Sequence, residues 1–188
     1  MKQRHNSEQG FSLLEMIVVV GVTMIGLAMA VIQTSSLLPN LKANSAMDQL
    51  SSQLRAARDT AMTQRRQVEV QFVGNNQLTV TVVEPVGVSP ATTITLGGGA
   101  QFMLFAGLPD TPMAFGNQAA TYFGGVSGGP VGMQFMTTGA LVDANGNPIS
   151  GTVFLGIPGP TTTPRAVTVL GATGRIREYH WDGKVWQE

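Results

Sequence analysis

The sequence predicts an α+β fold in which one long N-terminal helix packs on an antiparallel β-sheet domain. Three observations support this prediction: an apolar run near the N-terminus, a helical stripe of apolar residues after it, and short alternating segments from residue 68 onward. We therefore divide the 188 residues into a leader at 1–10, a long helix at 11–66 with a membrane-spanning part at 11–32, and a β-rich globular domain at 67–188.

The apolar run begins at Phe11 and ends at Ile32. A helix of these 22 residues would be about 33 Å long, which matches a hydrocarbon core of about 30 Å. Glu15 is the exception inside it, because a carboxylate in hydrocarbon costs about 2.5–3.5 kcal/mol and is by default a functional residue. Lys2 and Arg4 precede the run, so the positive-inside rule places the N-terminus in the cytoplasm and the C-terminal domain across the membrane.

The junction of Gly10 and Phe11, with Glu15 as the fifth residue after it, resembles the class III signal of the type IV pilin-like superfamily. The resemblance implies that a prepilin peptidase cuts between Gly10 and Phe11 on the cytoplasmic face and methylates the new amine. It also implies that Glu15 lies near the N-terminal ammonium of a neighbouring subunit. Opposite charges attract strongly in a low-dielectric medium and lower each other's cost of burial, which suits this role.

The N-terminal segment has two other interpretations, an ordinary secretory signal and a plain membrane anchor. Ala28-Met29-Ala30 is an A-x-A string, so residues 1–30 could be an ordinary secretory signal cleaved after Ala30. The apolar run could also be a plain membrane anchor. Neither alternative explains a glutamate five residues after Gly-Phe, and the run passes beyond the supposed cleavage site. We therefore expect a pilin-type signal.

Pro39 follows the apolar run and should bend or end the helix, after which Asn40 or Asn44 could cap a restart. Apolar residues at alternating spacings of three and four then predict a helix to about Arg66. We expect this stripe to pack on a β-sheet, since it is too short to argue for a coiled coil. The stripe consists of Met47, Leu50, Leu54, Ala57 and Ala61.

Arg55 and Asp59 lie four residues apart on the opposite side of the predicted helix. Residues three and four apart are neighbours on a helix surface, so we expect a weak ion pair between the two side chains.

Alternating apolar and polar residues predict the strands of the globular domain. Gly74-Asn75-Asn76 and Asp182-Gly183 are expected to be hairpin turns, the second with Lys184 opposite Trp181, and residues 107–132 to be mainly irregular. We expect strands at 68–72, 78–82, 92–96, 101–105, 120–123, 133–136, 152–155, 166–170, 175–181 and 184–186.

Two loops faintly resemble ligand-binding motifs. Residues 124–129 are rich in glycine like a phosphate-binding loop, but they lack its Lys-Ser/Thr ending. Residues 143–148 have the D-x-N-x-N opening of a calcium loop, but Pro148 and Phe154 replace the required glycine and glutamate. We interpret both as ordinary loops and expect no cofactor and no metal.

Composition argues against an enzyme. The chain has no cysteine, so thiolate nucleophiles, thiolate metal sites and disulfides are excluded. Only two histidines are present, and His5 lies in the leader, while His180 has no accompanying catalytic motif. The low charged fraction of 12% and the 23 glycines instead suit a loop-rich, extracytoplasmic β domain.

Within the type IV pilin-like superfamily, the chain resembles the GspH/FimT branch of minor pilins and pseudopilins. The resemblance implies assembly with other pilin or pseudopilin subunits through an inner-membrane platform, at or near the tip of a type II secretion pseudopilus or a type IV pilus. It rests on Leu54-Arg55-Ala56-Ala57-Arg58, Gln64-Arg65-Arg66-Gln67 and Gly174-Arg175-Ile176-Arg177.

The resemblance to FimT-type minor pilins also implies that the G-R-x-R segment can bind DNA. Strand alternation places Arg175, Arg177, Tyr179 and Trp181 on one face, which Lys184 would extend, and guanidinium groups and aromatic rings suit phosphates and bases. The alternative is that the aromatic residues pack in the sheet core. After the leader, nine basic and ten acidic side chains remain, so the domain lacks the positive charge usual for a DNA-binding protein.

Overall fold

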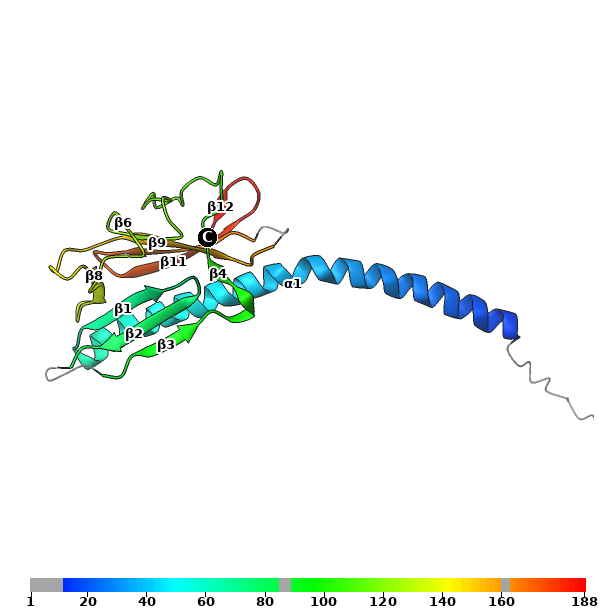
Figure 1. Cartoon of the computed structure of the whole chain (residues 1–188), viewed down its shortest axis with the longest axis horizontal. Coiled ribbons are helices and arrows are strands. Elements are labelled where there is room, and N and C mark those ends of the chain that lie inside the picture. The colour runs from blue at the N-terminus through cyan, green and yellow to red at the C-terminus, as the bar shows by residue number, and fades with distance from the viewer. Residues whose placement is uncertain (1–11, 85–88, 160–162) are drawn as a thin grey trace, which may run out of the picture. The chain divides into compact units, whose positions relative to one another are not determined.

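A computed structural model describes residues 12–84, 89–159 and 163–188, and only the backbone of residues 28–36. Gly10, Phe11 and the rest of the leader therefore lie outside the described residues. The chain divides into two compact units, residues 1–38 and 39–188. The predicted fold class is confirmed, because a long helix, α1 (Leu13–Gln64), precedes two antiparallel sheets (Figure 1).

The first sheet has the strand order β3-β2-β1-β7-β8, and the second has the order β12-β11-β10-β9-β5-β6, with β4 paired to β9. All neighbouring strands run antiparallel. The strands are β1 (Val68–Val73), β2 (Gln77–Val82), β3 (Thr92–Thr95), β4 (Gln101–Phe102), β5 (Thr121–Phe123), β6 (Val126–Ser127), β7 (Gln134–Phe135), β8 (Leu141–Val142), β9 (Gly151–Gly156), β10 (Arg165–Leu170), β11 (Arg175–Trp181) and β12 (Trp186–Gln187), with a short 3-10 turn at Gly97–Gly99.

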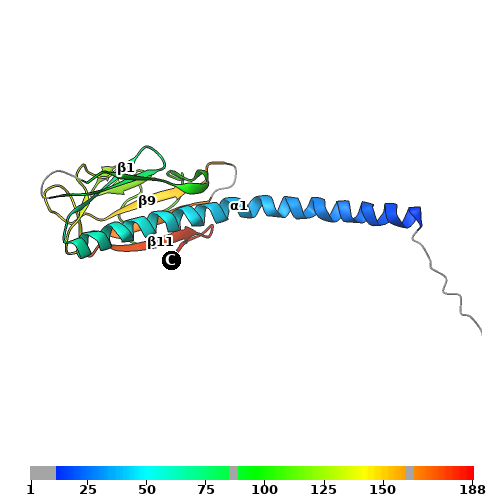
Figure 2. The ribbon, with the colours of Figure 1, turned by 90° about the horizontal axis from the view of Figure 1, so that it is seen from below.

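The second half of α1 packs its apolar stripe into the main core, as predicted. Leu50, Leu54 and Ala61 are at most 2% exposed and share a cluster with residues of both sheets, including Val68 and Val167. Figure 2 shows this part of α1 lying along the strands. A second, smaller cluster consists of Phe154, Ala166, Tyr179 and Trp186.

The predicted end and restart of the helix near Pro39 are wrong, because α1 contains this proline in its interior. A proline removes one backbone hydrogen bond and disfavours the turn before it. The burial of Ala43 and Ala46 only one and two turns later supplies packing that favours the helix, and packing outweighs local propensity. Asn40 and Asn44 consequently lie within α1 and cap no restart.

The strand predictions fail mainly where strands are very short. The predicted strand at 101–105 is reduced to β4, and β6 and β8 were missed. Two residues are too few to show alternation. The glycine-rich segment supplies the tight β5–β6 turn, in which Gly124 and Gly125 have positive φ angles of 57° and 83°.

The C-terminal hairpin has a longer loop than predicted. Trp181 pairs with Trp186 rather than with Lys184. Asp182 Oδ1 accepts hydrogen bonds from the backbone N–H groups of Lys184 and Val185 at 2.7 and 2.8 Å. This side chain therefore stabilises a four-residue connection in place of the expected two-residue turn.

Among the residues that the structure describes, we found no helix that is both long and apolar enough to cross a membrane.

Candidate functional site

The beginning of α1 is held by a serine cap. The backbone N–H of Glu15 donates to Ser12 Oγ at 3.2 Å, and the N–H of Met16 donates to the Ser12 carbonyl oxygen at 3.2 Å. Ser12-Leu13-Leu14-Glu15 thus has the spacing of a capping box, in which Ser is the N-cap and Glu is the third helical residue. The sequence analysis missed this pattern, in which the backbone of Glu15 takes part in the cap.

The carboxylate of Glu15 lies in the first turn of α1 and is exposed. A negative charge is favourable there because the unpaired N–H groups make the helix N-terminus partly positive. Among the described residues, the Glu15 carboxylate forms no ion pair.

The first half of α1 presents large apolar side chains to its surroundings. Leu13, Leu14 and Ile17 are 78%, 74% and 63% exposed. A contiguous apolar surface of this kind marks contact with a protein or a membrane. Other members of this surface are Met16, Val18, Val19, Val20, Val22, Met24, Ile25 and Leu27.

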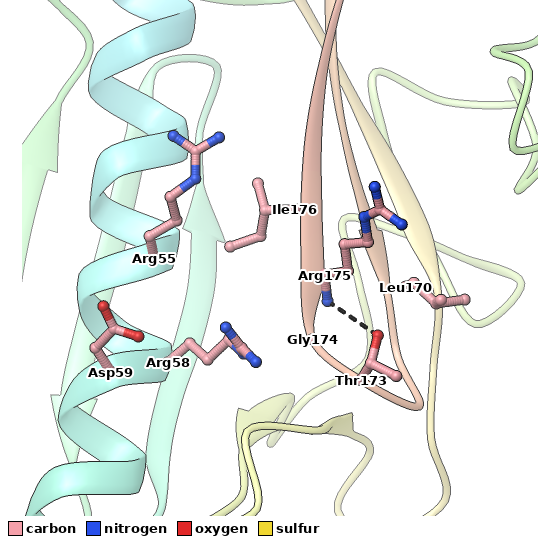
Figure 3. Close-up of a pocket in the computed structure, with 8 residues that line it drawn as sticks. All are labelled: Arg55, Arg58, Asp59, Leu170, Thr173, Gly174, Arg175 and Ile176. Atoms are coloured by element: carbon pink, nitrogen blue, oxygen red, sulfur yellow. Dashed lines mark hydrogen bonds between the residues drawn. The ribbon is translucent and has the colours of Figure 1, made fainter. Parts of the chain in front are cut away.

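A cavity of about 560 Å³ lies where the second half of α1 faces the beginning of β11. Figure 3 shows Arg58 extending from α1 toward β11, and Thr173 Oγ1 accepting the backbone N–H of Arg175. The cavity is lined by Arg55, Arg58, Asp59, Leu170, Thr173, Gly174, Arg175 and Ile176.

Gly174, the glycine of the G-R-x-R segment, has a steric reason to lack a side chain. Its φ of 62° lies in the left-handed region, and a Cβ there would collide with the carbonyl oxygen of Gly139 and the side chain of Arg58. Arg58 Nε donates to that same Gly139 oxygen at 3.4 Å. This glycine therefore allows the β10–β11 turn to approach α1 closely.

The structure does not bring the three predicted nucleic-acid-binding residues together. Arg175 is exposed beside the cavity, whereas Lys184 is exposed in the loop after the other end of β11. Six strand steps of about 3.3 Å separate the two ends of β11, a span of about 20 Å. Between them, Arg177 Nη1 forms an ion pair with Glu188 Oε2 at 3.1 Å.

The aromatic residues of this hairpin are mostly internal. Tyr179 and Trp186 are 2% and 8% exposed and belong to the smaller core cluster, and Trp181 packs against it. The structure thus favours the alternative in which these rings stabilise the sheet over the one in which they stack on bases.

Arg55 pairs with a different partner from the one predicted. Its Nη2 lies 2.6 Å from Glu178 Oε1 on β11, and no Arg55–Asp59 pair occurs among the described residues. Sequence spacing identifies neighbours along a helix, but it gives no information about a carboxylate that the sheet places across from it.

The segment 143–148 forms the expected turn. Asp143 Oδ1 accepts the backbone N–H groups of Asn145 and Asn147 at 2.9 Å each, and these bonds, the one from Asn147 foremost, lower the pKa of the Asp143 carboxyl. Within the described ranges, no three His, Asp or Glu side chains are grouped closely enough to hold a metal.

One family model matches the N-terminal part of the chain. Residues 5–31 match the family described as the prokaryotic N-terminal methylation motif. A comparison of the sequence with curated proteins found no match.

Solved structures of other proteins resemble this one. The chain is similar to the minor pseudopilin EpsH from the type 2 secretion system of Vibrio cholerae, with 14% identity over 73% of this chain and 95% of that one and a TM-score of 0.47. It is also similar to the type IV minor pilin FimU of Pseudomonas aeruginosa, with 16% identity over 78% of this chain and 92% of that one and a TM-score of 0.47. The methylation motif at residues 5–31 supports the predicted type IV pilin-like signal at the N-terminus of the chain.

Proposed function

We propose that this chain is a non-enzymatic minor pilin or pseudopilin that a prepilin peptidase cleaves between Gly10 and Phe11. Residues 11–32 hold the subunit in the bacterial inner membrane, with the N-terminus in the cytoplasm and the β domain in the periplasm. The subunit then enters a type II secretion pseudopilus or a type IV pilus at or near its tip, through the inner-membrane assembly platform. The observation that carries this proposal is the methylation motif at residues 5–31.

Glu15 fixes the register between subunits in this proposal. Cleavage leaves the ammonium of Phe11 next to the capped start of α1, where a positive charge is unfavourable because the helix end is itself partly positive. The carboxylate of a neighbour's Glu15 would neutralise that ammonium, and each group would lower the other's cost of burial. A subunit displaced along the filament axis would lose this pair.

The substitution Glu15→Gln tests the charge separately from the cap. Glutamine can take the place of glutamate in a capping box, so the local helix start is preserved. We expect incorporation into filaments to fall at least tenfold, measured as the ratio of filament-associated to membrane-associated protein in sheared preparations. Glu69→Gln, which removes a carboxylate from β1, serves as the matched control and should leave incorporation unchanged.

Two outcomes would contradict the proposal. Incorporation of Glu15→Gln at the wild-type level would remove the role of the charge. A mature N-terminus at Val31 instead of Phe11 would show that the ordinary secretory signal is the correct interpretation. Genes flanking this one would distinguish a secretion pseudopilus from a type IV pilus, because each machine has its own set of components.

DNA binding is a second candidate function, favoured by the gathering of Arg55, Arg58 and Arg175 around one cavity. Guanidinium groups bind phosphates through paired N–H donors, and the affinity of such contacts falls as salt rises. We would measure gel shifts across a salt series for the wild type, Arg175→Glu with Arg177→Glu, and Lys184→Glu. Unchanged affinity in the Arg175 and Arg177 variant would exclude this candidate.

A further inference from the structure

A buried arginine joins the second sheet to α1. Arg165 is the first residue of β10, and only 6% of its surface is exposed. Its Nε donates to Asn44 Oδ1 at 2.7 Å, and its Nη2 donates to Asn40 Oδ1 at 3.3 Å. The remaining bond runs from Nη1 to the carbonyl oxygen of Pro164 at 2.9 Å.

All three acceptors are neutral, so none of them compensates the charge of Arg165. Three ion pairs occur among the described residues, and none of them includes Arg165. The segments outside the described ranges contain one acidic residue, Glu8 in the leader. Burial lowers the pKa of Arg165 because the charged form loses hydration, but a guanidinium stays protonated in proteins. An uncompensated buried charge is costly, and an added anion would offset that cost.

The guanidinium also borders an open space. A cavity of about 310 Å³ is lined by Arg165, Asn44, Met47, Asp48 and His180. A guanidinium has five N–H donors, of which three are used here, so two are available for a ligand. One N–H group therefore remains on each of Nη1 and Nη2, and paired N–H groups of a guanidinium can bind the two oxygens of a carboxylate.

The other charged and titratable groups of the cavity indicate the class of anion. Asp48 follows Asn44 one turn later on α1 and is exposed, and it forms no ion pair with Arg165 among the described residues. Its negative charge would repel a dianion such as phosphate more strongly than a monoanion. His180 supplies one further polar group from β11.

We propose that the cavity beside Arg165 binds a carboxylate, and that in the filament this carboxylate is an Asp or Glu side chain of a neighbouring subunit. The identity of the partner as a subunit rests on the proposed function, whereas the carboxylate site itself does not. Asn40 and Asn44 hold the guanidinium in place, and the incoming carboxylate accepts its two remaining N–H groups. The ion pair between Arg165 and this carboxylate is then a second contact between subunits, in addition to the one proposed for Glu15.

The first experiment tests the site without a filament. The full chain, purified in detergent, is unfolded by heat in sodium acetate, sodium chloride or sodium phosphate of equal ionic strength at pH 7. A ligand that binds only the native state raises the unfolding midpoint. We expect acetate to raise the midpoint above that in chloride, with an effect that saturates, and phosphate to raise it less than acetate does.

Two variants identify the site. Asp48→Asn removes the repelling charge and should lower the apparent dissociation constant for acetate by about threefold, whereas Arg165→Lys loses the paired donors and should abolish the shift. If Arg165→Lys does not fold, Asp48→Asn alone remains decisive. The carboxylate site would be overturned if acetate did not raise the unfolding midpoint above that in chloride. It would also be overturned if phosphate raised the midpoint as much as acetate, or if neither variant changed the effect of acetate. A large loss of stability in Asp48→Asn would overturn it too, because it would make Asp48 the counter-ion.

The second experiment tests the source of the carboxylate. Filament incorporation of Arg165→Lys is compared with that of Arg177→Lys, a matched control whose partner, Glu188, lies in the same chain. We expect at least a fivefold loss for Arg165→Lys alone. Suppose that both variants enter filaments equally well while acetate still raises the unfolding midpoint of the wild type. The ligand of the cavity would then be a free carboxylate and not a side chain of the neighbouring subunit. Neither result depends on whether Glu15→Gln assembles.

Discussion

Leu13 and Ile17 in the first half of α1 expose 78% and 63% of their surface, whereas Leu50 and Leu54 in the second half expose 1% and 2%. Residue type does not explain this contrast, since Leu13 is exposed in the first half and Leu50 is buried in the second, but the arrangement of the apolar residues does. From Leu13 to Leu27 the helix exposes apolar side chains at most positions, whereas the second half has one apolar stripe. A helix with one stripe can be covered by a sheet, whereas a helix that is apolar all round requires an apolar environment on every side.

The largest effect should come from a stripe residue. Leu54→Ala leaves a cavity in the main core and should lower the free energy of unfolding of the domain by about 2–5 kcal/mol. Denaturant unfolding can be followed by the fluorescence of the two tryptophans, Trp181 and Trp186, both of which lie in the globular unit.

Ile17→Ala is the matched control, because it removes an equally apolar side chain from the exposed half. It should leave the unfolding of the domain unchanged. An equal loss of stability in both variants would show that the two halves of α1 do not differ in the way described.

The next effect concerns the place where the stripe-bearing half of α1 meets the turn before β11. Gly174→Ala forces a Cβ against Gly139 and Arg58 and should cost about 1–3 kcal/mol of unfolding free energy. Gly183→Ala also has a positive φ, of 100°, but its Cβ would enter open space. Gly183→Ala should therefore lower the free energy of unfolding less than Gly174→Ala does. Equal losses in the two variants would show that the positive φ alone, and not the collision of the Cβ, causes the effect.

The ion pair between Arg55 and Glu178 should contribute less. The two side chains are 51% and 26% exposed, and exposed pairs are typically worth about 0.2–1 kcal/mol. A double-mutant cycle of Arg55→Met and Glu178→Gln should give a coupling in this range that weakens at high salt. The same cycle with Asp59→Asn should give none, and a larger coupling there would restore the pair expected from the sequence.

The smallest effect is expected in the C-terminal hairpin loop, far along the chain from the helix. The backbone N–H of Val185, followed by that of Lys184, stabilises the Asp182 carboxylate and lowers its pKa. A carboxyl with a lowered folded-state pKa stabilises the fold above its unfolded value of about 3.9, and the contribution disappears as the pH falls through the folded value. Between pH 6 and pH 2, the unfolding midpoint of Asp182→Asn should therefore decline less than that of the wild type. An equally steep decline would contradict this account.

Sequence reasoning succeeded where the signal is local. The β1–β2 hairpin was predicted because Gly74-Asn75-Asn76 separates two alternating segments, and its register indeed pairs Val73 with Gln77. The stripe from Met47 to Ala61 was predicted because helical periodicity is visible in neighbouring residues. Both features depend on interactions within a few residues of the chain.

Reasoning from sequence failed where the partner of a side chain lies far away along the chain. Asn40 and Asn44 were expected to cap a restarted helix, but in the structure they accept hydrogen bonds from Arg165, more than 120 residues away. The ion pair of Arg55 with Glu178 is a similar case. No spacing rule could identify these partners, because the sheet brings them to α1.

The sequence by itself determined the long helix and the antiparallel character of the domain, because both depend on residue type and short-range periodicity. The signal at Gly10, Phe11 and Glu15 is predicted from the same kind of local pattern. Only the tertiary structure decided that Arg165 lies buried with no ion-pair partner in the described part of the chain, and that Gly174 must lack a side chain. Burial and close approach depend on how two segments pack against each other, so neither can be predicted from the sequence of one segment alone.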